Sequence, residues 1–502
     1  MTVLDNRSTR SIARGLASRY PLFYLVTADE QQVAQLMPSI ARSWLGEGGA
    51  VHHWSVMQGL DCDPDATREP LAVIEWILDR AGNGDPAVYL LQDLPAWLEG
   101  NPILQRALRE LYQRLQGTRN VVFMTYPKLS LPEVVGKEVF VVELEPPDEV
   151  EILANLQRHP QGAGLDESVR ARLAARLRGL SLDEINHLAA RLFRGGHVPE
   201  EAELMREIQE EKAQVLKKER CLQFYPSSVS LEDIGGLENL KHWVTQRRML
   251  FSEQAYRDRV PLPAGILFMG VSGCGKSMAA KAVAAAWSLP LVRLDMSLVL
   301  SGTFGTPEYA FERATRIAGQ IAPVVLWIDE LENAFGYDAM GGAGGRTTIF
   351  SSFLTWLQEK SPKVFVAATA NRIQQLPAEL MRKGRFDQLF FLDLPTDEER
   401  REILAIHIRR HGGEPGQFDL GYLAASTQGW SGAEIEQVVK SARMDAYAAG
   451  RAFTERDIVH NAVDTVPLSR TMVEQIKEIR NWCFKRAVNA SGPARDRPGG
   501  QA

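Results

Sequence analysis

The sequence predicts an α/β protein built from two modules, each a parallel sheet between helices, with a small helical domain after the second. Three observations support this fold class. Short apolar segments typical of buried strands alternate with amphipathic helical segments in both halves of the chain. One strand runs through a glycine-rich loop directly into a helix. The two halves also repeat one order of strands and turns.

The first half contains strand candidates separated by helical segments, which is typical of a parallel sheet covered on both faces. The strand candidates are residues 22–27, 52–57, 87–91, 120–125 and 139–144. The helical candidates are residues 29–44, 71–80 and 103–115, followed by a mostly helical stretch over 148–193.

Changes in composition divide the chain into six predicted segments. Residues 199–225 are dense in charge with a helical period, and the tail is rich in proline, glycine and charge, which is typical of disorder. The segments are an N-terminal α/β domain (1–198), a helical linker (199–228), a second α/β domain (229–395), a helical lid (396–465), a C-terminal helix (466–490) and a disordered tail (491–502).

The two halves share a series of turns and strands. Residues 121–149 contain an apolar strand, a Leu-Pro turn, a second apolar strand and Pro-x-Asp-Glu, and residues 364–398 repeat that order at nearly the same spacing. We therefore predict that residues 20–195 are a copy of the second module. The alternative is that two unrelated α/β units share turn chemistry.

Composition narrows the class of protein. A net charge of −6 gives no electrostatic reason to expect nucleic acid or an anionic membrane as a partner. The 4 cysteines form no C-x-x-C pair and resemble neither a zinc site nor a disulfide framework. No secretory signal and no apolar run long enough to span a bilayer are visible, so we expect a cytoplasmic protein.

The segment Gly270–Ser277 has the pattern G-x-x-x-x-G-K-[ST] between a strand and a helix. Glycines let successive backbone N–H groups turn inward around a phosphate, and the helix N-terminus adds partial positive charge. We expect Lys276 to reach the β- and γ-phosphates of ATP and the Ser277 hydroxyl to ligate Mg²⁺. The predicted nucleotide contacts of this loop are Gly270, Val271, Ser272, Gly273, Cys274, Gly275, Lys276, Ser277 and Met278.

Two further strands deliver polar groups to the same edge of a parallel sheet. Residues 323–328 are apolar and end in Asp329 and Glu330. Asp329 is expected to hold the Mg²⁺ shell, and Glu330 to act as the base that orients the attacking water. The strand over 364–369 is followed by Asn371, placed to bond the γ-phosphate or the water, although an asparagine capping a turn is the alternative.

Arg382 and Arg385 lie three residues apart beside a glycine, a pattern poorly explained by a core. Arginine supplies planar donors for the charge on transferring phosphoryl oxygens. Surface ion pairing is the alternative interpretation.

Together with SLEDIGGL (230–237) and GWSGAE (429–434), these motifs resemble the AAA ATPase module over residues 229–465. The resemblance implies Walker A and Walker B motifs, a ring that is usually a hexamer, and ATP at each subunit boundary. Arg382 and Arg385 would then act on the nucleotide of the neighbouring subunit. The resemblance also implies an adenine and ribose pocket formed by Asp233, Ile234, Gly235, His407, Gly432 and Ala433.

A narrower resemblance covers nearly the whole chain. Segments such as RYPLFYLVT, VHHWSV and the ending PLSRTMVEQIKEIRNWCFKRA are similar to the "hypothetical chloroplast reading frame forty-six" family of uncharacterised AAA proteins from plastids, cyanobacteria and other bacteria. No established substrate comes with that family.

Two departures from the AAA pattern affect the expected function. The first module has Ala28-Asp29-Glu30 in place of a glycine-rich loop and Leu91-Gln92-Asp93 in place of the acidic pair, so it is a degenerate AAA-like domain not expected to bind ATP. In residues 301–308, Thr303 stands where polypeptide-threading AAA proteins carry an aromatic residue, with Phe304 beside it. Residues 338–348 carry four glycines and are interpreted as a second loop facing the ring axis, or as a plain surface loop.

The leading hypothesis is an Mg-ATP-hydrolysing ring that acts as a motor and remodels an unidentified protein partner. A nucleotide-gated regulatory scaffold with slow turnover is the first alternative. A DNA-processing ATPase of clamp-loader type is the second, disfavoured by the acidic balance.

Overall fold

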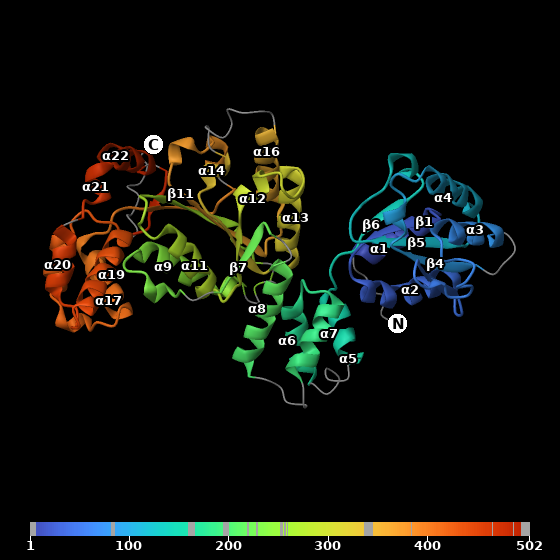
Figure 1. Cartoon of the computed structure of the whole chain (residues 1–502), viewed down its shortest axis with the longest axis horizontal. Coiled ribbons are helices and arrows are strands. Elements are labelled where there is room, and N and C mark those ends of the chain that lie inside the picture. Colours follow the sequence, from blue (N-terminus) through green and yellow to red (C-terminus); the bar gives the residue numbers. More distant parts are fainter. Residues whose placement is uncertain are drawn as a thin grey trace. The chain divides into compact units, whose positions relative to one another are not determined.

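The chain folds into two compact units, Met1–Glu211 and Lys212–Ala502, coloured by position along the sequence in Figure 1. The computed structural model describes residues 7–81, 86–158, 166–193, 200–217, 220–226, 229–251, 255, 258, 260–335, 345–382, 384–463, 465–484 and 486–492. The tail predicted to be disordered lies outside these residues from 493 onward, as do residues 338–344 of the predicted glycine-rich loop.

The first unit is an α/β module that ends in helices (Figure 1). Its sheet has the order β3-β2-β4-β5-β1-β6, and its pairs are parallel except that of the two-residue strand β3 with β2. The strands are β1 (Leu22–Val26), β2 (Ala50–Ser55), β3 (Gly59–Leu60), β4 (Ala87–Gln92), β5 (Val121–Tyr126) and β6 (Phe140–Glu143). The helices are α1 (Arg7–Ala17), α2 (Glu30–Leu45), α3 (Pro70–Arg80), α4 (Pro102–Leu115), α5 (Glu149–Arg158), α6 (Glu167–Leu177) and α7 (Leu182–Leu192), with 3₁₀ turns at Leu94–Trp97 and Glu133–Val135. Helix α8 (Glu201–Lys217) runs from this unit into the second, because the boundary between the units falls after Glu211.

Alternate residues of the central strands fill two apolar cores, one on each face of this sheet. Phe23 and Leu25 of β1 pack with helices α1 and α2 on one face. Leu22 and Tyr24 pack with helices α3 and α4 on the other. Because strand side chains alternate in direction, a continuous apolar strand is buried on both faces.

The second unit has a seven-stranded sheet in the order β13-β12-β8-β11-β10-β9-β7. Its strands are β7 (Leu222–Tyr225), β8 (Gly265–Gly270), β9 (Leu291–Leu294), β10 (Val324–Ile328), β11 (Val364–Ala370), β12 (Gln388–Leu392) and β13 (Val488–Asn489). The helices that cover the sheet are α9 (Glu238–Arg247), α11 (Lys276–Ala286), α12 (Met296–Leu300), α13 (Pro307–Gln320), α14 (Leu331–Phe335) and α16 (Gly345–Glu359). The 3₁₀ turns are Leu231–Asp233, Arg248–Phe251, Ile373–Gln375, Ala378–Met381 and Pro415–Gln417.

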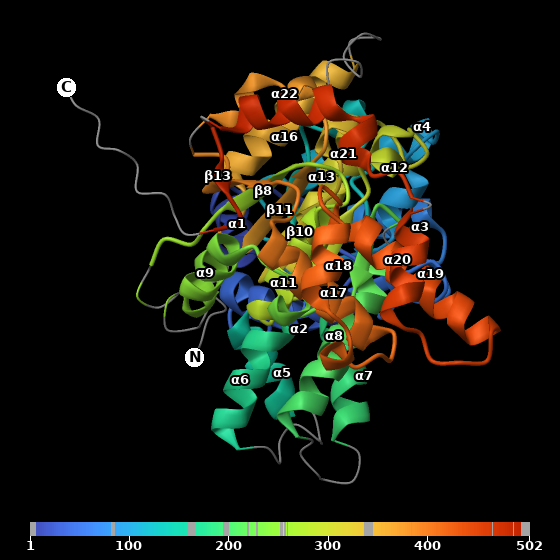
Figure 2. The same cartoon turned by 90° about the vertical axis from the view of Figure 1, so that its left-hand side faces the viewer.

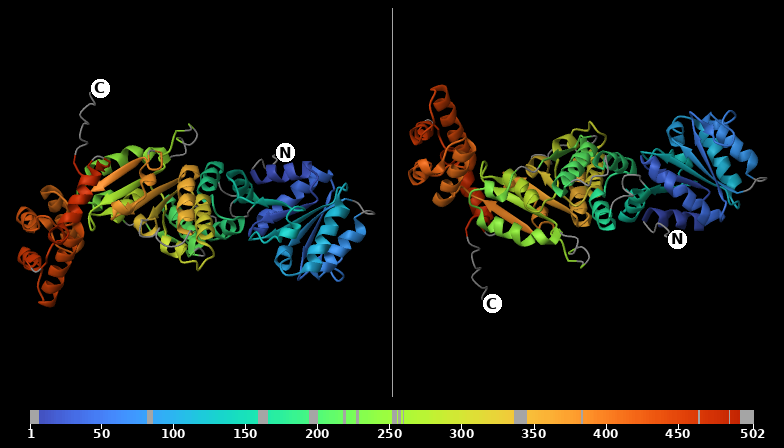
Figure 3. Two further views of the ribbon diagram at one scale, coloured as in Figure 1. Left: turned by 90° about the horizontal axis from the view of Figure 1, so that it is seen from above. Right: turned by 90° about the horizontal axis from the view of Figure 1, so that it is seen from below.

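Figure 3 shows this sheet with helices on both faces. Ile266 and Phe268 of β8 face the core that contains α9 and α11. Leu267 and Met269 face the core that contains α13 and α16. The alanine-rich sequence of α11 favours helix and brings its backbone close to the sheet.

The helical part of the second unit follows the sheet and has its own apolar core, which includes Leu404, Trp430 and Val439. Figure 2 shows these helices gathered beside the sheet. They are α17 (Asp397–Arg410), α18 (Leu420–Ser426), α19 (Gly432–Ala448) and α20 (Glu455–Val463), and α21 (Leu468–Thr471) and α22 (Val473–Cys483) follow.

The two units share one strand order. Five strands are common to the two sheets, and in chain order they are β1, β2, β4, β5 and β6 in the first and β8, β9, β10, β11 and β12 in the second. In each sheet the first of these common strands lies between the fourth and the fifth. The sequence β2-β4-β5-β1-β6 in the first unit therefore matches β9-β10-β11-β8-β12 in the second. This confirms the predicted fold class, with two α/β modules of the same topology.

Two short strands replace predicted helix. The helix expected over 199–225 ends at Lys217, and β7 pairs antiparallel with β9 because Leu222 is buried in the sheet core. Near the end of the predicted C-terminal helix, residues 488–489 form β13 on the edge of β12. The carbonyl of Ala490 then accepts N–H groups from the start of α9, so this segment is tied to the second module.

Candidate functional site

The glycine-rich loop leaves β8 and enters α11 in the conformation expected of an anion-binding turn. Gly270, Gly273 and Gly275 have φ values of 141°, 79° and 87°, which residues other than glycine rarely adopt. A Cβ atom on Gly270 would lie 2.0 Å from the carbonyl oxygen of Leu392. The loop therefore requires glycine here, and it ends at the N-terminus of α11, where anions are favoured.

Lys276 is buried at the base of this loop. Its Nζ donates hydrogen bonds to the carbonyl oxygens of Gly270 and Val271 at 2.9 and 2.7 Å. Burial lowers the pKa of Lys276 to about 8, although nearby acids, including Glu332 and Asp329, act in the opposite direction. The loop carbonyls thus hold the cation at a position where phosphate oxygens could replace them.

Three oxygen-bearing side chains meet beside Lys276. The Ser277 hydroxyl donates to Asp329 Oδ1 at 3.1 Å, and the Thr369 hydroxyl donates to the same oxygen at 2.6 Å. Hydroxyl and carboxylate oxygens are the ligands that Mg²⁺ prefers. The donor set therefore fits the divalent ion that Ser277 and Asp329 are expected to hold. Thr369 was not predicted.

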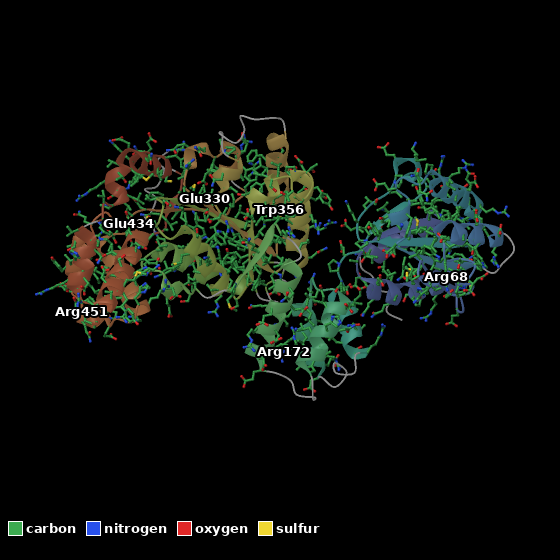
Figure 4. All side chains as sticks on the ribbon, in the orientation of Figure 1. Arg68, Arg172, Glu330, Trp356, Glu434 and Arg451 are labelled. Atoms are coloured by element: carbon green, nitrogen blue, oxygen red, sulfur yellow. The ribbon has the colours of Figure 1, made fainter. Side chains whose placement is uncertain are left out.

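Glu330 follows Asp329 with a positive φ of 50°, and its backbone N–H donates to the Thr369 hydroxyl. Its carboxylate accepts hydrogen bonds from Asn371 Nδ2 at 3.2 Å and from Asn333 Nδ2 at 2.6 Å. Figure 4 labels Glu330 in the α/β part of the second unit. The predicted base and the predicted polar residue of the next strand are therefore in contact, and Asn333 is a partner that the sequence analysis missed.

Glu332 is a second residue that the sequence analysis missed. It is 4% exposed, and its Oε1 accepts the backbone N–H groups of Asn371 and Arg372 at 2.8 and 3.2 Å. The only feature of the sequence that could have pointed to Glu332 is its position two residues after Glu330. Glu332 thus fixes the end of β11, from which Asn371 reaches Glu330.

One pocket of about 320 Å³ contains most of the predicted site residues. This volume is at the lower end of small-molecule sites, roughly 300–1,000 Å³. The predicted residues that line it are Asp233, Ile234, Gly235, Ser272, Gly273, Cys274, Gly275, Lys276, Ser277, Met278, Asp329, Glu330, Asn371, His407, Gly432 and Ala433. The lining residues that were not predicted are Leu237, Thr369, Asp393, Pro395, Glu399, Ile403, Ile406, Glu436 and Ser491.

The far end of the pocket is formed by the helical part of the same unit. The backbone N–H of Ala433 donates to the carbonyl of Gly273 at 3.0 Å, which ties α19 to the phosphate loop. His407 is buried, so its pKa is lowered, and its Nδ1 lies 3.8 Å from Glu436 Oε1. Apolar Ile403 and Ile406 line the pocket near this neutral imidazole. Such a mixed surface fits a heterocyclic base.

Four predicted site residues are not among the described residues that line this pocket. The carbonyls of Gly270 and Val271 instead face Lys276. Arg382 is exposed, whereas Arg385 is half-buried and donates a hydrogen bond to the carbonyl oxygen of Glu379. The two arginines therefore lie in different environments, and Arg382 is the more exposed of the two.

Phe304, the aromatic residue beside Thr303, packs partly against the core of the second module. The guanidinium of Arg220 lies 5.9 Å from the centre of its ring. This contact agrees with ordinary packing of Phe304 within its loop. Within the described part of the chain, every helix is too short or too polar to cross a membrane.

Comparisons with known proteins agree with this architecture. The family described as "ATPase family associated with various cellular activities (AAA)" matches residues 266–394, the "AAA+ lid domain" matches 417–460, and the "SpoVK-like AAA ATPase, N-terminal domain" matches 8–144.

Three similar relatives are each described as "Uncharacterized AAA domain-containing protein ycf46". The relative from Pyropia yezoensis is 33% identical over 96% of this chain and 99% of its own length. Those from Guillardia theta and Trieres chinensis are 33% and 31% identical, over 93% and 96% of this chain and 93% and 97% of their own lengths.

Proposed function

This chain belongs to the ycf46 family of AAA domain-containing proteins, and we propose that it binds Mg-ATP in the second unit and hydrolyses it. The observation that carries this proposal is the convergence of Lys276, Ser277, Asp329 and Glu330 in one pocket. A cation, a hydroxyl, a metal-binding acid and a candidate base are the groups that phosphoryl transfer to water requires.

The roles of the side chains follow from their positions. Lys276 would exchange its two loop carbonyls for phosphate oxygens. Ser277 and Asp329 would hold Mg²⁺, which neutralises phosphate charge when bound. Glu330 would accept a proton from the attacking water while Asn371 orients its carboxylate. His407 and the two isoleucines beside it would receive the adenine.

We further propose that the protein works as a ring, and the position of Arg382 supports this proposal. This residue is exposed and is not among the described residues at the pocket of its own chain. An arginine finger that acts on a neighbouring subunit must be free in the isolated chain. In this proposal the ring is a hexamer, and nucleotide turnover drives the remodelling of a protein partner.

A second function, a nucleotide-gated scaffold with slow turnover, is favoured by one observation. Both oxygens of the Glu330 carboxylate are engaged by amide donors of Asn333 and Asn371. Each of these donors occupies one acceptor site of an oxygen and restricts the directions from which a water molecule can approach the carboxylate. Hydrolysis would then be slow, and the bound nucleotide would set assembly.

Turnover by the wild type, Glu330→Gln and Lys276→Ala separates these functions. Glu330→Gln should still bind ATP, lose at least about 10²-fold in ATPase rate and stabilise a ring in size-exclusion chromatography. Lys276→Ala should lose ATP binding. A wild-type rate equal to that of Glu330→Gln, with ATP bound by both, would exclude the motor and leave the scaffold. Absence of ATP binding by the folded wild type would exclude both.

A further inference from the structure

Three potential metal ligands of different types meet at the edge of the first unit. His52 lies on β2, and Asp61 and Cys62 follow the short strand β3. One ring nitrogen of His52, one carboxylate oxygen of Asp61 and the Cys62 sulfur all lie within 4.8 Å of one another. His52 belongs to the VHHWSV segment, to which the proposed ATPase activity assigns no role.

The hairpin between β2 and β3 holds these side chains together. The Asp61 N–H donates to the His53 carbonyl at 3.0 Å, and the His53 N–H donates to Asp61 Oδ2 at 3.1 Å. The other oxygen of Asp61 lies 3.0 Å from His52 Nδ1. The His52 ring stacks on the ring of Tyr89, with 5.6 Å between their centres. The imidazole and the carboxylate are therefore oriented by the fold.

The turn that carries Cys62 is anchored to the core by a buried threonine. The Thr67 hydroxyl donates to the Asp63 carbonyl at 2.6 Å and accepts the Leu60 N–H at 2.7 Å. Trp54 Nε1 donates to the Thr67 carbonyl at 2.5 Å. Trp54 and Thr67 are 1% and 0% exposed, so both ends of the turn are fixed. A turn held in this way loses little entropy when its side chains bind an ion.

We propose that His52, Asp61 and Cys62 bind one zinc ion. Thiolate, imidazole and carboxylate together suit Zn²⁺, whereas Mg²⁺ and Ca²⁺ prefer oxygen ligands alone. In a tetrahedral zinc site, nitrogen and oxygen ligands are about 3.3 Å apart and sulfur and nitrogen about 3.6 Å. The observed 3.0 Å between His52 and Asp61 is close to the first value. Shifts of about 1 Å would bring the full set to these spacings.

Charge and exposure also suit this ion. The thiolate of Cys62 and the carboxylate of Asp61 together balance the two positive charges of zinc. Cys62 is exposed, and the side chains of His52 and Asp61 are 26% and 44% exposed. The ion can therefore enter from solvent, and its fourth position is open to water or to an added ligand.

The first unit also contains a matched histidine–aspartate pair without a thiol. His187 Nδ1 lies 3.8 Å from Asp183 Oδ2 on the exposed face of α7. Zinc bound through ordinary surface histidines would occupy both pairs, whereas zinc bound at the proposed site requires Cys62. His187→Gln is thus the control for His52→Gln.

The test uses the full chain, stripped with a chelator and titrated with Zn²⁺ or Co²⁺. The wild type and His187→Gln should each retain one zinc per chain after gel filtration, and cobalt should give a thiolate charge-transfer band. Cys62→Ser and His52→Gln should weaken zinc affinity more than about tenfold and abolish that band. Lys276→Ala should bind zinc like the wild type, because Lys276 belongs to the second unit and the three proposed ligands belong to the first.

A second measurement covers variants that fold poorly. In the wild type, zinc should slow alkylation of Cys62, identified by peptide mapping, relative to alkylation in chelator. Equal zinc content in the wild type and a folded Cys62→Ser, or a Cys62 alkylation rate unchanged by zinc, would overturn the proposal.

Discussion

The carboxylate of Asp29 accepts the backbone N–H of Leu182 at 2.8 Å, and its other oxygen accepts the N–H of Gln32 at 2.9 Å. Leu182 begins α7 and Gln32 lies in the first turn of α2, so one side chain caps two helices. By strand order, α2 corresponds to α11 of the second unit, which begins at the phosphate loop. The first unit therefore carries a carboxylate where the second has its proposed phosphate site.

Removing this carboxylate should destabilise the first unit. Asp29→Ala is expected to cost about 1–2 kcal/mol, because two N–H groups at helix N-termini lose their acceptor. Thermal unfolding of the full chain, followed by circular dichroism, would show the loss in the first unit's transition. Glu30→Ala removes the same charge from the same helix end, but Glu30 is exposed, so it should change stability by under about 0.5 kcal/mol. Equal effects of the two substitutions would contradict the double-cap interpretation.

Nucleotide affinity should fall as the pH rises through the pKa of Lys276. That pKa is about 8 in the free protein, and the protonated form is the one that binds phosphate. The affinity for Mg-ATP should therefore be highest below pH 8, where Lys276 is mostly protonated, and should fall by up to about tenfold per pH unit above it. Burial raises the pKa of Cys274 to about 12, so this neighbouring thiol stays neutral throughout.

Calorimetric titrations of Mg-ATP at pH values from about 7 to about 9.5 would measure this slope. Lys276→Arg keeps its charge over the whole range and is the control for general effects of pH. A slope shared by the wild type and Lys276→Arg would show that another group titrates.

Glu332 should act on turnover through the backbone of Asn371. Glu332→Gln keeps the shape of the side chain but weakens its hold on two N–H groups. We expect the ATPase kcat to fall about tenfold while the Kd for ATP changes less than twofold, because Glu332 is not among the described pocket residues. The matched control is Glu359→Gln at an exposed position on α16. A parallel loss of kcat and ATP affinity would contradict this positioning role.

Arg382 should act on the nucleotide of a neighbouring chain. Arg382→Ala and Lys276→Ala are each expected to be inactive alone, and mixing them should restore activity. In randomly mixed rings about one quarter of the subunit boundaries join an intact pocket to an intact arginine. ATPase assays on mixtures refolded or exchanged together would detect this recovery. Mixtures as inactive as the separate variants, in rings confirmed to be mixed, would contradict action between subunits.

The phosphate loop and the acidic strand end could be predicted from the sequence because both patterns are local. The partners of these residues depend instead on strand register. Pairing of Ile328 with Ala368 sets the residues that follow, Asp329 and Thr369, side by side. Threonine at a strand end carries no pattern of its own, so the hydroxyl that bonds Asp329 was missed. The same holds for Asn333, which reaches Glu330 across one turn of helix.

The fold was predictable where apolar strands are long enough to show a pattern. Strand β11 has seven buried residues and was predicted within one residue of its ends, whereas β3 and β13 have two residues each and show no periodicity. Strand β7 was hidden by the charged helix before it. Its place in the sheet comes from pairing with β9, which lies almost seventy residues further along the chain.

The proposed ATPase function depends on binding of the ATP phosphates by the loop from Gly273 to Ser277, and titration calorimetry of the folded full chain measures that binding. The wild type should bind one Mg-ATP per chain, and Lys276→Ala should bind at least about 10²-fold more weakly with its unfolding temperature unchanged. Binding of equal strength by the two proteins, or no heat of binding from the folded wild type, would show that this loop is not the phosphate site.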